Sequence, residues 1–267
     1  MVVPTPSFDF LNGRGDMRFA ELPEVSSSEF THQVSIGVIV DGWPEDTATC
    51  IRALLAHAPT DVRVIALDLG DVDGAGAVLD QFVTASAGRL QVVHVEETLH
   101  DVGWAAARTA LLKLDTAEIH GVLDLSTVFD GDAVTPLLDA FGDVTVVASG
   151  WRGVNMDTTD WYSFVDAGPG EVDALLGYYF LVRRDAGIAT PPHPKAHFYR
   201  NAELEWGLAL RAAGGRIVAP VDGLPAHQDR HRGYHDSDPD YRDEESKKTY
   251  MRMLKRFKGR DEILAPR

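Results

Sequence analysis

The stretch VSIGVIVDGWPEDTATCIRALLAH, residues 34–57, predicts a strand, a short polar loop and a helix. Its first seven residues are a β-branched apolar run, which is typical of a strand buried in a parallel sheet. Pro44 is placed to open the helix, and Ile51, Leu54 and Leu55 are spaced to share one of its faces. A buried strand that leads into an amphipathic helix is the repeating unit of α/β folds.

The same alternation continues along the chain. Further strands are predicted at 62–68, 90–95, 121–125, 144–149, 175–184 and 216–221, and helices at 74–87, 103–114, 132–141 and 202–215, with a loop-rich stretch at 150–170. The expected fold class is α/β, with a mostly parallel sheet covered by helices on both faces. No Gly-x-Gly-x-x-Gly pattern follows the first strand, which disfavours a dinucleotide-binding domain.

The composition is that of an ordinary globular protein. The chain has 267 residues, of which 45 % are hydrophobic, and a single cysteine, Cys50, which excludes an intramolecular disulfide framework and a Cys-rich zinc site. A reducing, cytoplasmic location is expected. The N-terminus lacks the pattern of a secretory signal, and no apolar run approaches the length of a membrane span. The formal net charge of −16 disfavours nucleic acid as a partner.

Basic residues are concentrated near the C-terminus. The segment SKKTYMRMLKRFKGR, residues 246–260, predicts an amphipathic helix with Tyr250, Leu254 and Phe257 on one side. The favoured interpretation is a helix packed on the domain. A homodimer contact and a peripheral contact with an anionic membrane are the alternatives.

Three aspartates stand where predicted strands end. Asp41 follows the first strand, Asp68 ends the second and Asp124 lies near the end of the fourth. Ligands of open α/β sheets bind beyond the carboxyl ends of the strands. Asp124 is the strongest candidate, because an unpaired buried carboxylate is costly and a hard cation such as Mg²⁺ or Mn²⁺ would pair with it. A helix cap or a hydrogen bond to a loop is the alternative for Asp124.

Acidic and aromatic side chains in the second half supply further candidates. Glu203 and Glu205 begin a predicted helix, where negative charge is favoured, and a carboxylate at the edge of a polar pocket can also act as a general base. Among the aromatic residues, Trp161 and Trp206 are the candidates for an acceptor platform. Packing in the core or in a loop is the alternative for both.

Histidines follow the last predicted strand at four-residue intervals, in LPAHQDRHRGYHDSD. Three imidazoles on one side of a helix would form a metal site, but Gly233 and the flanking prolines favour a loop. We therefore expect one metal ligand, His227, with His231 and Arg232 contacting phosphate or capping structure.

Residues 34–235 resemble the family 2 glycosyltransferases, which have the Rossmann-like GT-A fold. The stretch 34–57 resembles their opening strand and helix, and RVIALDLGD resembles their second strand, whose final aspartate, here Asp68, usually meets the nucleotide base. GWAAARTALL resembles their Gly-x-x-x-Ala-Arg-Asn helix, with Arg108 retained and Thr109 in place of asparagine. HFYRNAELEWGLALRAAGGRI resembles the helix that carries the catalytic base, at Glu203.

One departure from the family pattern lies at residues 122–126. VLDLS occupies the position of the metal-binding Asp-x-Asp motif, so that a serine replaces the second carboxylate. The segment 231–264 resembles an actinobacterial branch in which Asp-x-Ser commonly replaces Asp-x-Asp. A serine hydroxyl is a weaker oxygen ligand than a carboxylate, and Mg²⁺ tolerates water in its shell. The departure lowers the expected metal affinity without excluding catalysis.

The resemblance implies transfer of a sugar, with inversion, from a UDP-, GDP- or dTDP-linked donor to a carbohydrate, lipid-linked or small-molecule acceptor. It implies a GT-A domain at 34–235, with a nucleotide-binding half (34–126) and an acceptor half (127–235). An N-terminal arm (1–33) precedes this domain, and a basic helical extension (236–267) follows it. The implied site residues are Glu203 as base; Val40, Asp41, Asp68, Arg108, Asp124, Leu125 and Ser126 for the donor; and Asp124, Ser126 and His227 for the metal.

Two other functions are considered. A nucleotidyltransferase is disfavoured, because DGWPED lacks the Gly-rich loop with Arg or Lys that usually follows the first strand in that class. A non-catalytic protein that binds sugar nucleotides or glycans is supported by the missing second carboxylate. The retained Glu203 and His227 count against it.

Overall fold

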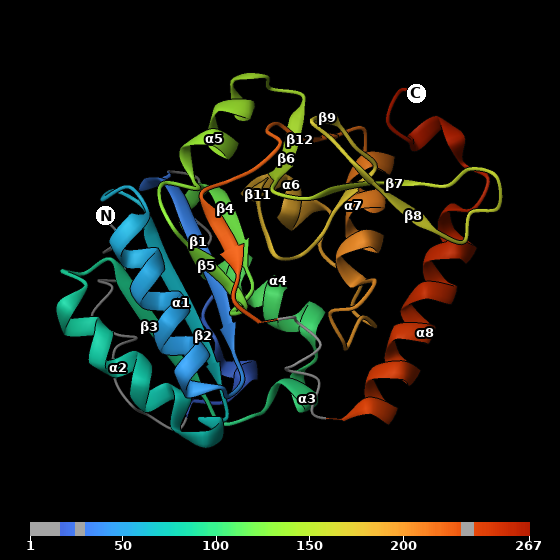
Figure 1. The fold of residues 1–267 in the computed structure, drawn as a ribbon. Helices are drawn as coiled ribbons and strands as arrows, with labels where there is room; N and C mark the ends of the chain where they lie inside the picture. The colour runs from blue at the N-terminus through green and yellow to red at the C-terminus, as the bar shows by residue number, and fades with distance from the viewer. Residues whose placement is uncertain (1–16, 25–29, 231–237) are drawn as a thin grey trace, which may run out of the picture.

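The computed structural model describes residues 17–24, 30–230 and 238–267 (Figure 1). The first half contains β1 (His32–Val40), α1 (Pro44–His57), β2 (Arg63–Leu69), α2 (Ala75–Ala85), β3 (Leu90–Val95), α3 (Leu99–Val102), α4 (Trp104–Leu114) and β4 (Ala117–Leu123). The second half contains β5 (Thr127–Phe129), α5 (Thr135–Leu138), β6 (Val146–Gly150), β7 (Gly153–Met156), β8 (Phe164–Ala167), β9 (Gly170–Glu171), β10 (Ala174–Leu175), β11 (Tyr179–Arg183), α6 (Arg184–Ala189), α7 (Ala202–Ala212), β12 (Arg216–Ala219), β13 (Ala226–Gln228) and α8 (Pro239–Phe257).

The central sheet has eight strands in the order β3-β2-β1-β4-β11-β6-β12-β9. Strands β3, β2, β1 and β4 are parallel, whereas β11 runs antiparallel between β4 and β6. This arrangement confirms the expected mixed α/β class with a mostly parallel sheet. The antiparallel direction of β11 is a feature that the sequence pattern did not predict.

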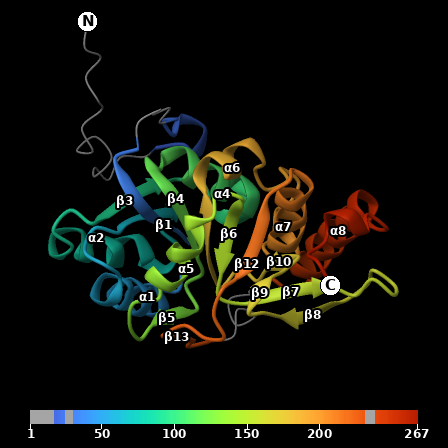
Figure 2. The same ribbon diagram turned by 90° about the horizontal axis from the view of Figure 1, so that it is seen from above.

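Helices cover both faces of the sheet, as expected (Figure 2). Ile36 and Val38 of β1 pack with Ile51 and Leu54 of α1 on one face. On the other face, side chains of α4 and α7 pack against the intervening strand residues such as Ile39. Alternate residues of one strand therefore enter different cores, which explains why its whole sequence is apolar.

The second half of the chain differs from the prediction in three places. The stretch 150–170, predicted to be loop-rich, contains β7 and β8, which form a small antiparallel sheet with β10. The predicted strand 175–184 is divided, because β10 pairs with β7 whereas β11 joins the central sheet. The predicted helix 132–141 is replaced by the short helix α5 and a 3-10 turn at Asp139–Gly142. The pairing of β11 with β4 joins segments far apart in the chain, so local periodicity does not reveal it.

The C-terminal helix α8 packs on α7, as the favoured interpretation predicted (Figure 1). It begins seven residues earlier than expected, at Pro239, and the side chain of Asp238 caps it by accepting a hydrogen bond from the Tyr241 amide. Leu254 and Phe257 are buried in a cluster that α7 shares. Within the described part of the chain, we find no helix with the length and hydropathy of a membrane span.

Candidate functional site

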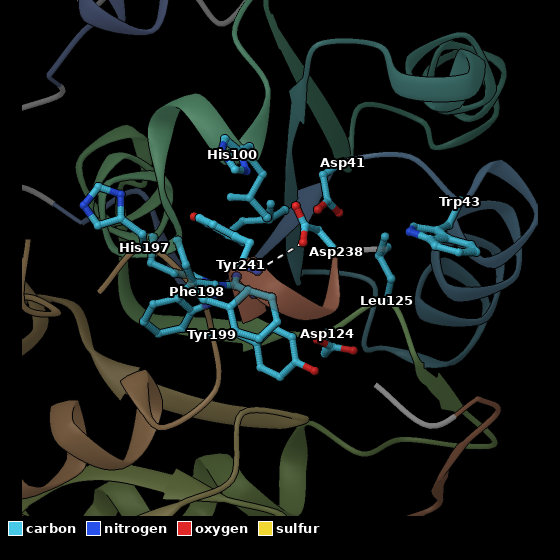
Figure 3. A pocket seen from close by; sticks show the side chains of 14 residues that line it. Asp41, Trp43, His100, Asp124, Leu125, His197, Phe198, Tyr199, Asp238 and Tyr241 are labelled. Atoms are coloured by element: carbon cyan, nitrogen blue, oxygen red, sulfur yellow. Dashed lines mark hydrogen bonds between the residues drawn. The ribbon is translucent and has the colours of Figure 1, made fainter. Parts of the chain in front are cut away.

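A pocket opens beyond the carboxyl ends of β1 and β4 (Figure 3). Asp41 follows β1 and Asp124 follows β4, and both line this pocket together with Trp43 and Leu125. Trp43 is held at a φ of 58°, in the left-handed region that a bulky residue rarely adopts. The pocket lies where ligands of open α/β sheets bind, and two of the three predicted strand-end aspartates meet there.

Ser126 holds the side chain of Asp124. The Asp124 Oδ1 atom accepts hydrogen bonds from the Ser126 amide at 3.0 Å and from the Ser126 hydroxyl at 2.6 Å. The Asp124 amide donates to the carbonyl of Tyr178, which precedes β11. Because Ser126 is only 1 % exposed, its hydroxyl orients the carboxylate from within the protein. The serine of the Asp-x-Ser motif thus has a defined structural role beside Asp124.

Arg108 lies beneath the same pocket. Its guanidinium donates from Nη1 to the Gly37 carbonyl at 2.9 Å and from Nη2 to the Leu123 carbonyl at 3.1 Å. The side chain is 3 % exposed and stacks on Trp104, 5.9 Å from its ring centroid. Arg108 therefore links β1 to β4 and places a positive charge below the strand ends that carry Asp41 and Asp124.

Asp68 occupies a different environment from the other two aspartates. It is 1 % exposed, and its Oδ2 atom lies 2.7 Å from Nδ1 of His94, whose Nε2 lies 3.1 Å from Asp80. The hydrogen bond to Asp68 raises the pKa of His94, against the opposing effect of burial. A side chain at Gly76 would collide with the Asp68 carboxylate, so α2 begins close against it. Asp68 does not line the pocket, and its contact with a nucleotide base stays a prediction.

Glu203 is the second residue of α7 and is 6 % exposed. It lines a small cavity with Phe180 and Trp206, separate from the pocket that holds Asp124. Glu205, two residues later in α7, is 1 % exposed and forms salt bridges with two arginines of α8. The structure thus gives Glu205 an ion-pairing role, whereas the catalytic role of Glu203 stays a prediction.

The two tryptophans predicted for an acceptor platform lie in the core. Trp161 is 4 % exposed in the cluster beneath α8, and Trp206 is 1 % exposed with its Nε1 donating to the Thr190 carbonyl at 2.7 Å. Stacking on a sugar requires an accessible ring face, which neither side chain has here. Packing, the alternative interpretation of both residues, describes them better. Val40 is also fully buried, so its side chain belongs to the core rather than to the pocket lining.

The predicted metal ligands are only partly brought to the pocket. His227 lies in β13, about half exposed, with its Nδ1 2.7 Å from Asp130 Oδ2, and it does not line the pocket. Within the described ranges, no group of three or more His, Cys, Asp or Glu side chains is arranged to hold a metal ion. Asp124 is thus the one predicted ligand in the described pocket lining. His231 and Arg232 lie outside the described residues.

Aromatic residues that the sequence analysis missed form another part of the pocket (Figure 3). They are His100 of α3, Phe198 and Tyr199 before α7, and Tyr241 of α8. HFYR, directly before the helix that carries Glu203, is a local signal for Phe198 and Tyr199. Tyr241 has no local signal, because only the packing of α8 brings it to the pocket.

The sequence matches the family model described as glycosyl transferase family 2 over residues 38–204, more than half of the chain. A search of the curated proteins gives no match. Among solved structures, the chain is similar to GalNAc-T7 with UDP, GalNAc and Mn²⁺, with 13 % identity, a TM-score of 0.65 and coverage of 86 % of this chain and 48 % of the other. It is also similar to the mannosyltransferase PcManGT from Pyrobaculum calidifontis with GDP-Man and Mn²⁺, with 16 % identity, a TM-score of 0.62 and coverage of 90 % and 71 %. The chain thus spans about half the length of the GalNAc-T7 chain, and both likenesses concern the fold.

Proposed function

Because the chain belongs to glycosyl transferase family 2 and has the GT-A fold, we propose that it transfers a sugar from a nucleotide diphosphate donor to an acceptor hydroxyl with inversion at the anomeric carbon. The observation that carries this proposal is the position of Asp124. It follows the buried strand β4 where the family has its metal-binding motif, and it lines a pocket with Asp41 at the end of β1.

The donor would lie along the carboxyl ends of β1 and β4. Asp41 and Trp43 line the β1 side of the pocket, where a nucleoside with its ring faces and hydroxyl groups would be accommodated. Arg108 contributes positive potential from below, and Asp68 is the proposed partner of the base. UDP, named with GalNAc-T7, and GDP-Man, named with PcManGT, support a UDP- or GDP-linked donor, with dTDP as the third candidate.

A divalent cation fits this pocket through Asp124. Mg²⁺ usually binds through one or two protein carboxylates and takes its remaining oxygens from substrate phosphates and water, so a three-ligand protein cluster is not required. Ser126 orients the Asp124 carboxylate by two hydrogen bonds. His227 is a proposed further ligand, which would give up its hydrogen bond to Asp130 in order to bind the metal. When bound, Mg²⁺ or Mn²⁺ would offset the negative charge of the departing diphosphate.

Glu203 is the proposed general base. The sequence resemblance implies that Glu203 stands where the family carries its catalytic carboxylate, and Glu203 lies within the matched residues 38–204. It would take the proton from the acceptor hydroxyl as that oxygen forms its bond to the anomeric carbon and the diphosphate departs. The acceptor, whether a carbohydrate, a lipid-linked sugar or a small molecule, must therefore place its hydroxyl near the start of α7.

Thermal-shift melting with UDP, GDP and dTDP, each with and without Mn²⁺, tests the donor site. A ligand that binds only the folded state raises the melting temperature by mass action. We expect one nucleotide to stabilise the wild-type protein in a Mn²⁺-dependent manner and the Asp124→Ala variant to lose that dependence. Equal stabilisation of both proteins would contradict the metal site at Asp124.

A non-catalytic sugar-nucleotide or glycan-binding protein is the second candidate. Ser126 in place of a second carboxylate favours it, because this change weakens the metal site on which leaving-group departure depends. A panel of nucleotide sugars and acceptors separates the two functions. A transferase consumes the donor only in the presence of an acceptor, whereas a binding protein holds the donor without releasing free nucleotide.

A further inference from the structure

The last helix of the chain forms part of the pocket (Figure 3). Asp238, the N-cap of α8, and Tyr241, in its first turn, both line the pocket that contains Asp41 and Asp124. The family match ends at residue 204, well before this helix. The C-terminal extension therefore adds side chains to the site from outside the residues that match the family model.

Tyr241 packs as an aromatic residue but carries an additional polar group. Its ring centroid lies 4.2 Å from that of His100 and 6.1 Å from that of Phe198, with the Phe198 ring nearly perpendicular to it. Its hydroxyl is buried and has no hydrogen-bond partner among the described residues. Phenylalanine would make the same ring contacts without burying an unsatisfied hydroxyl, which is costly. Stability alone thus does not explain the hydroxyl.

The position of Tyr241 is fixed by contacts farther along α8. Arg252 and Arg256 of α8 both bind the buried Glu205 of α7. The side-chain amide of Asn201, directly before α7, donates to the Ser246 carbonyl at 3.1 Å. These contacts connect α8 to α7, the helix that carries the proposed base in its first turn. The hydroxyl is therefore held in place before any ligand arrives, a feature of preorganised binding sites.

We propose that Tyr241 is a substrate-binding residue whose hydroxyl forms a hydrogen bond with a hydroxyl group of a pyranose ring bound against His100 and Phe198. A pyranose suits this wall, because its C–H faces pack on aromatic rings while its hydroxyl groups require polar partners. This inference rests on the proposed function, since it takes the pocket to be the sugar-transfer site. The ring belongs either to the donor sugar or to the acceptor, and the two sources are separable by experiment.

The test compares Tyr241→Phe with a matched control, Tyr250→Phe. Tyr250 lies on the same helix, outside the pocket lining, and its hydroxyl donates to the Tyr162 carbonyl at 2.7 Å. Both variants lose one hydroxyl from α8. Burial raises the pKa of Tyr241, so its hydroxyl stays protonated in neutral buffer and the substitution removes a donor. The measurements are the melting temperature, the KM for donor and acceptor, and the Kd for the nucleotide sugar and the bare nucleoside diphosphate.

We expect Tyr241→Phe to raise the KM of one sugar substrate by about tenfold, as the loss of one hydrogen bond to a substrate hydroxyl does. Its melting temperature should be unchanged or higher, because no bond within the protein is lost. Tyr250→Phe should lower the melting temperature and leave each KM unchanged. A weaker Kd for the nucleotide sugar, with the Kd for the bare diphosphate unchanged, assigns the ring to the donor. A raised acceptor KM alone assigns it to the acceptor.

Two results would contradict the assignment, and they differ from each other. If wild type and Tyr241→Phe bind and turn over every sugar substrate equally, Tyr241 does not contact substrate, although the transferase function stands. If the wild-type protein neither binds nor turns over any nucleotide sugar across the donor panel, the proposed function fails and the assignment of Tyr241 fails with it.

Discussion

The carboxylate of Glu205 on α7 is bound by Arg252 on α8 through both of its oxygens. The Nε atom of Arg252 donates to Oε1 at 2.9 Å and Nη2 donates to Oε2 at 2.6 Å, and Arg256 adds a further bond to Oε1 at 2.7 Å. Glu205 is 1 % exposed, so this carboxylate depends on the two arginines. Arg252 and Arg256 of α8 thus form salt bridges within the protein. They account for part of the basic charge that suggests a membrane or partner contact.

Replacing Arg252 should therefore destabilise the protein strongly. Arg252→Met leaves the buried Glu205 carboxylate with Arg256 alone, and breaking a buried pair in this way costs about 3–5 kcal/mol. The free energy of unfolding in urea measures the effect. Lys255→Met, at an exposed position on the same helix, is the control and should change the free energy by less than about 0.5 kcal/mol. A small effect of Arg252→Met would mean that Arg256 alone satisfies Glu205.

Glu203→Gln tests the proposed base directly. The amide keeps the size of the side chain but cannot accept a proton, so turnover should fall by about 10²–10⁴-fold while nucleotide binding changes little. Steady-state rates with a saturating donor, together with nucleotide-dependent melting shifts, separate these effects. Unchanged turnover in the variant would remove Glu203 from the mechanism, and a pocket carboxylate such as Asp238 would be tested next.

Ser126→Ala tests whether the serine of Asp-x-Ser acts by holding Asp124. Hydrogen bonds to charged groups contribute about 1.5–3 kcal/mol, so loss of the 2.6 Å bond should weaken Mn²⁺-dependent nucleotide binding by roughly tenfold or more. Titration of nucleotide at fixed Mn²⁺ measures this change. Ser149→Ala is the control, since the buried Ser149 hydroxyl has no hydrogen-bond partner among the described residues and lies outside the pocket lining. Equal affinity in wild type and Ser126→Ala would show that Asp124 needs no such support.

The sequence predicted the parts of the fold that depend on local pattern. The strand and helix at residues 34–57 were predicted closely, because apolar periodicity and Pro44 act within one segment. The antiparallel insertion of β11 was missed, because its direction depends on pairing with β4 and β6. A pattern of residue types also does not distinguish a buried ring from an exposed one, so it does not reveal that Trp206 lies in the core.

The predicted site residues also divide into those placed by local sequence pattern and those placed by packing in three dimensions. Asp41, Asp68 and Asp124 are all predicted at the carboxyl ends of strands, and Asp41 and Asp124 line one pocket because β1 and β4 are neighbours in the sheet. Asp68 was placed with them on the same argument, but its hydrogen bond to His94 on the neighbouring strand β3 became visible only in three dimensions. Tyr241 reaches the pocket from another part of the chain, through the ion pairs that fix α8 on α7.

The contact between His94 and Asp68 predicts a pH-dependent contribution to stability. The hydrogen bond to Asp68 raises the folded-state pKa of His94 above its ordinary value of 6.5, so the folded protein binds a proton more tightly than the unfolded chain does. The resulting stabilisation is complete below pH 6.5 and disappears as the pH rises through the higher folded-state pKa. His94→Gln, which cannot take up that proton, should flatten the fall in unfolding free energy as the pH rises above 6.5. The exposed His57→Gln, at the end of α1, is the control and should keep the wild-type slope. If both variants keep that slope, the fall in stability comes from groups other than His94, and the proton between Asp68 and His94 is not held more tightly in the folded state.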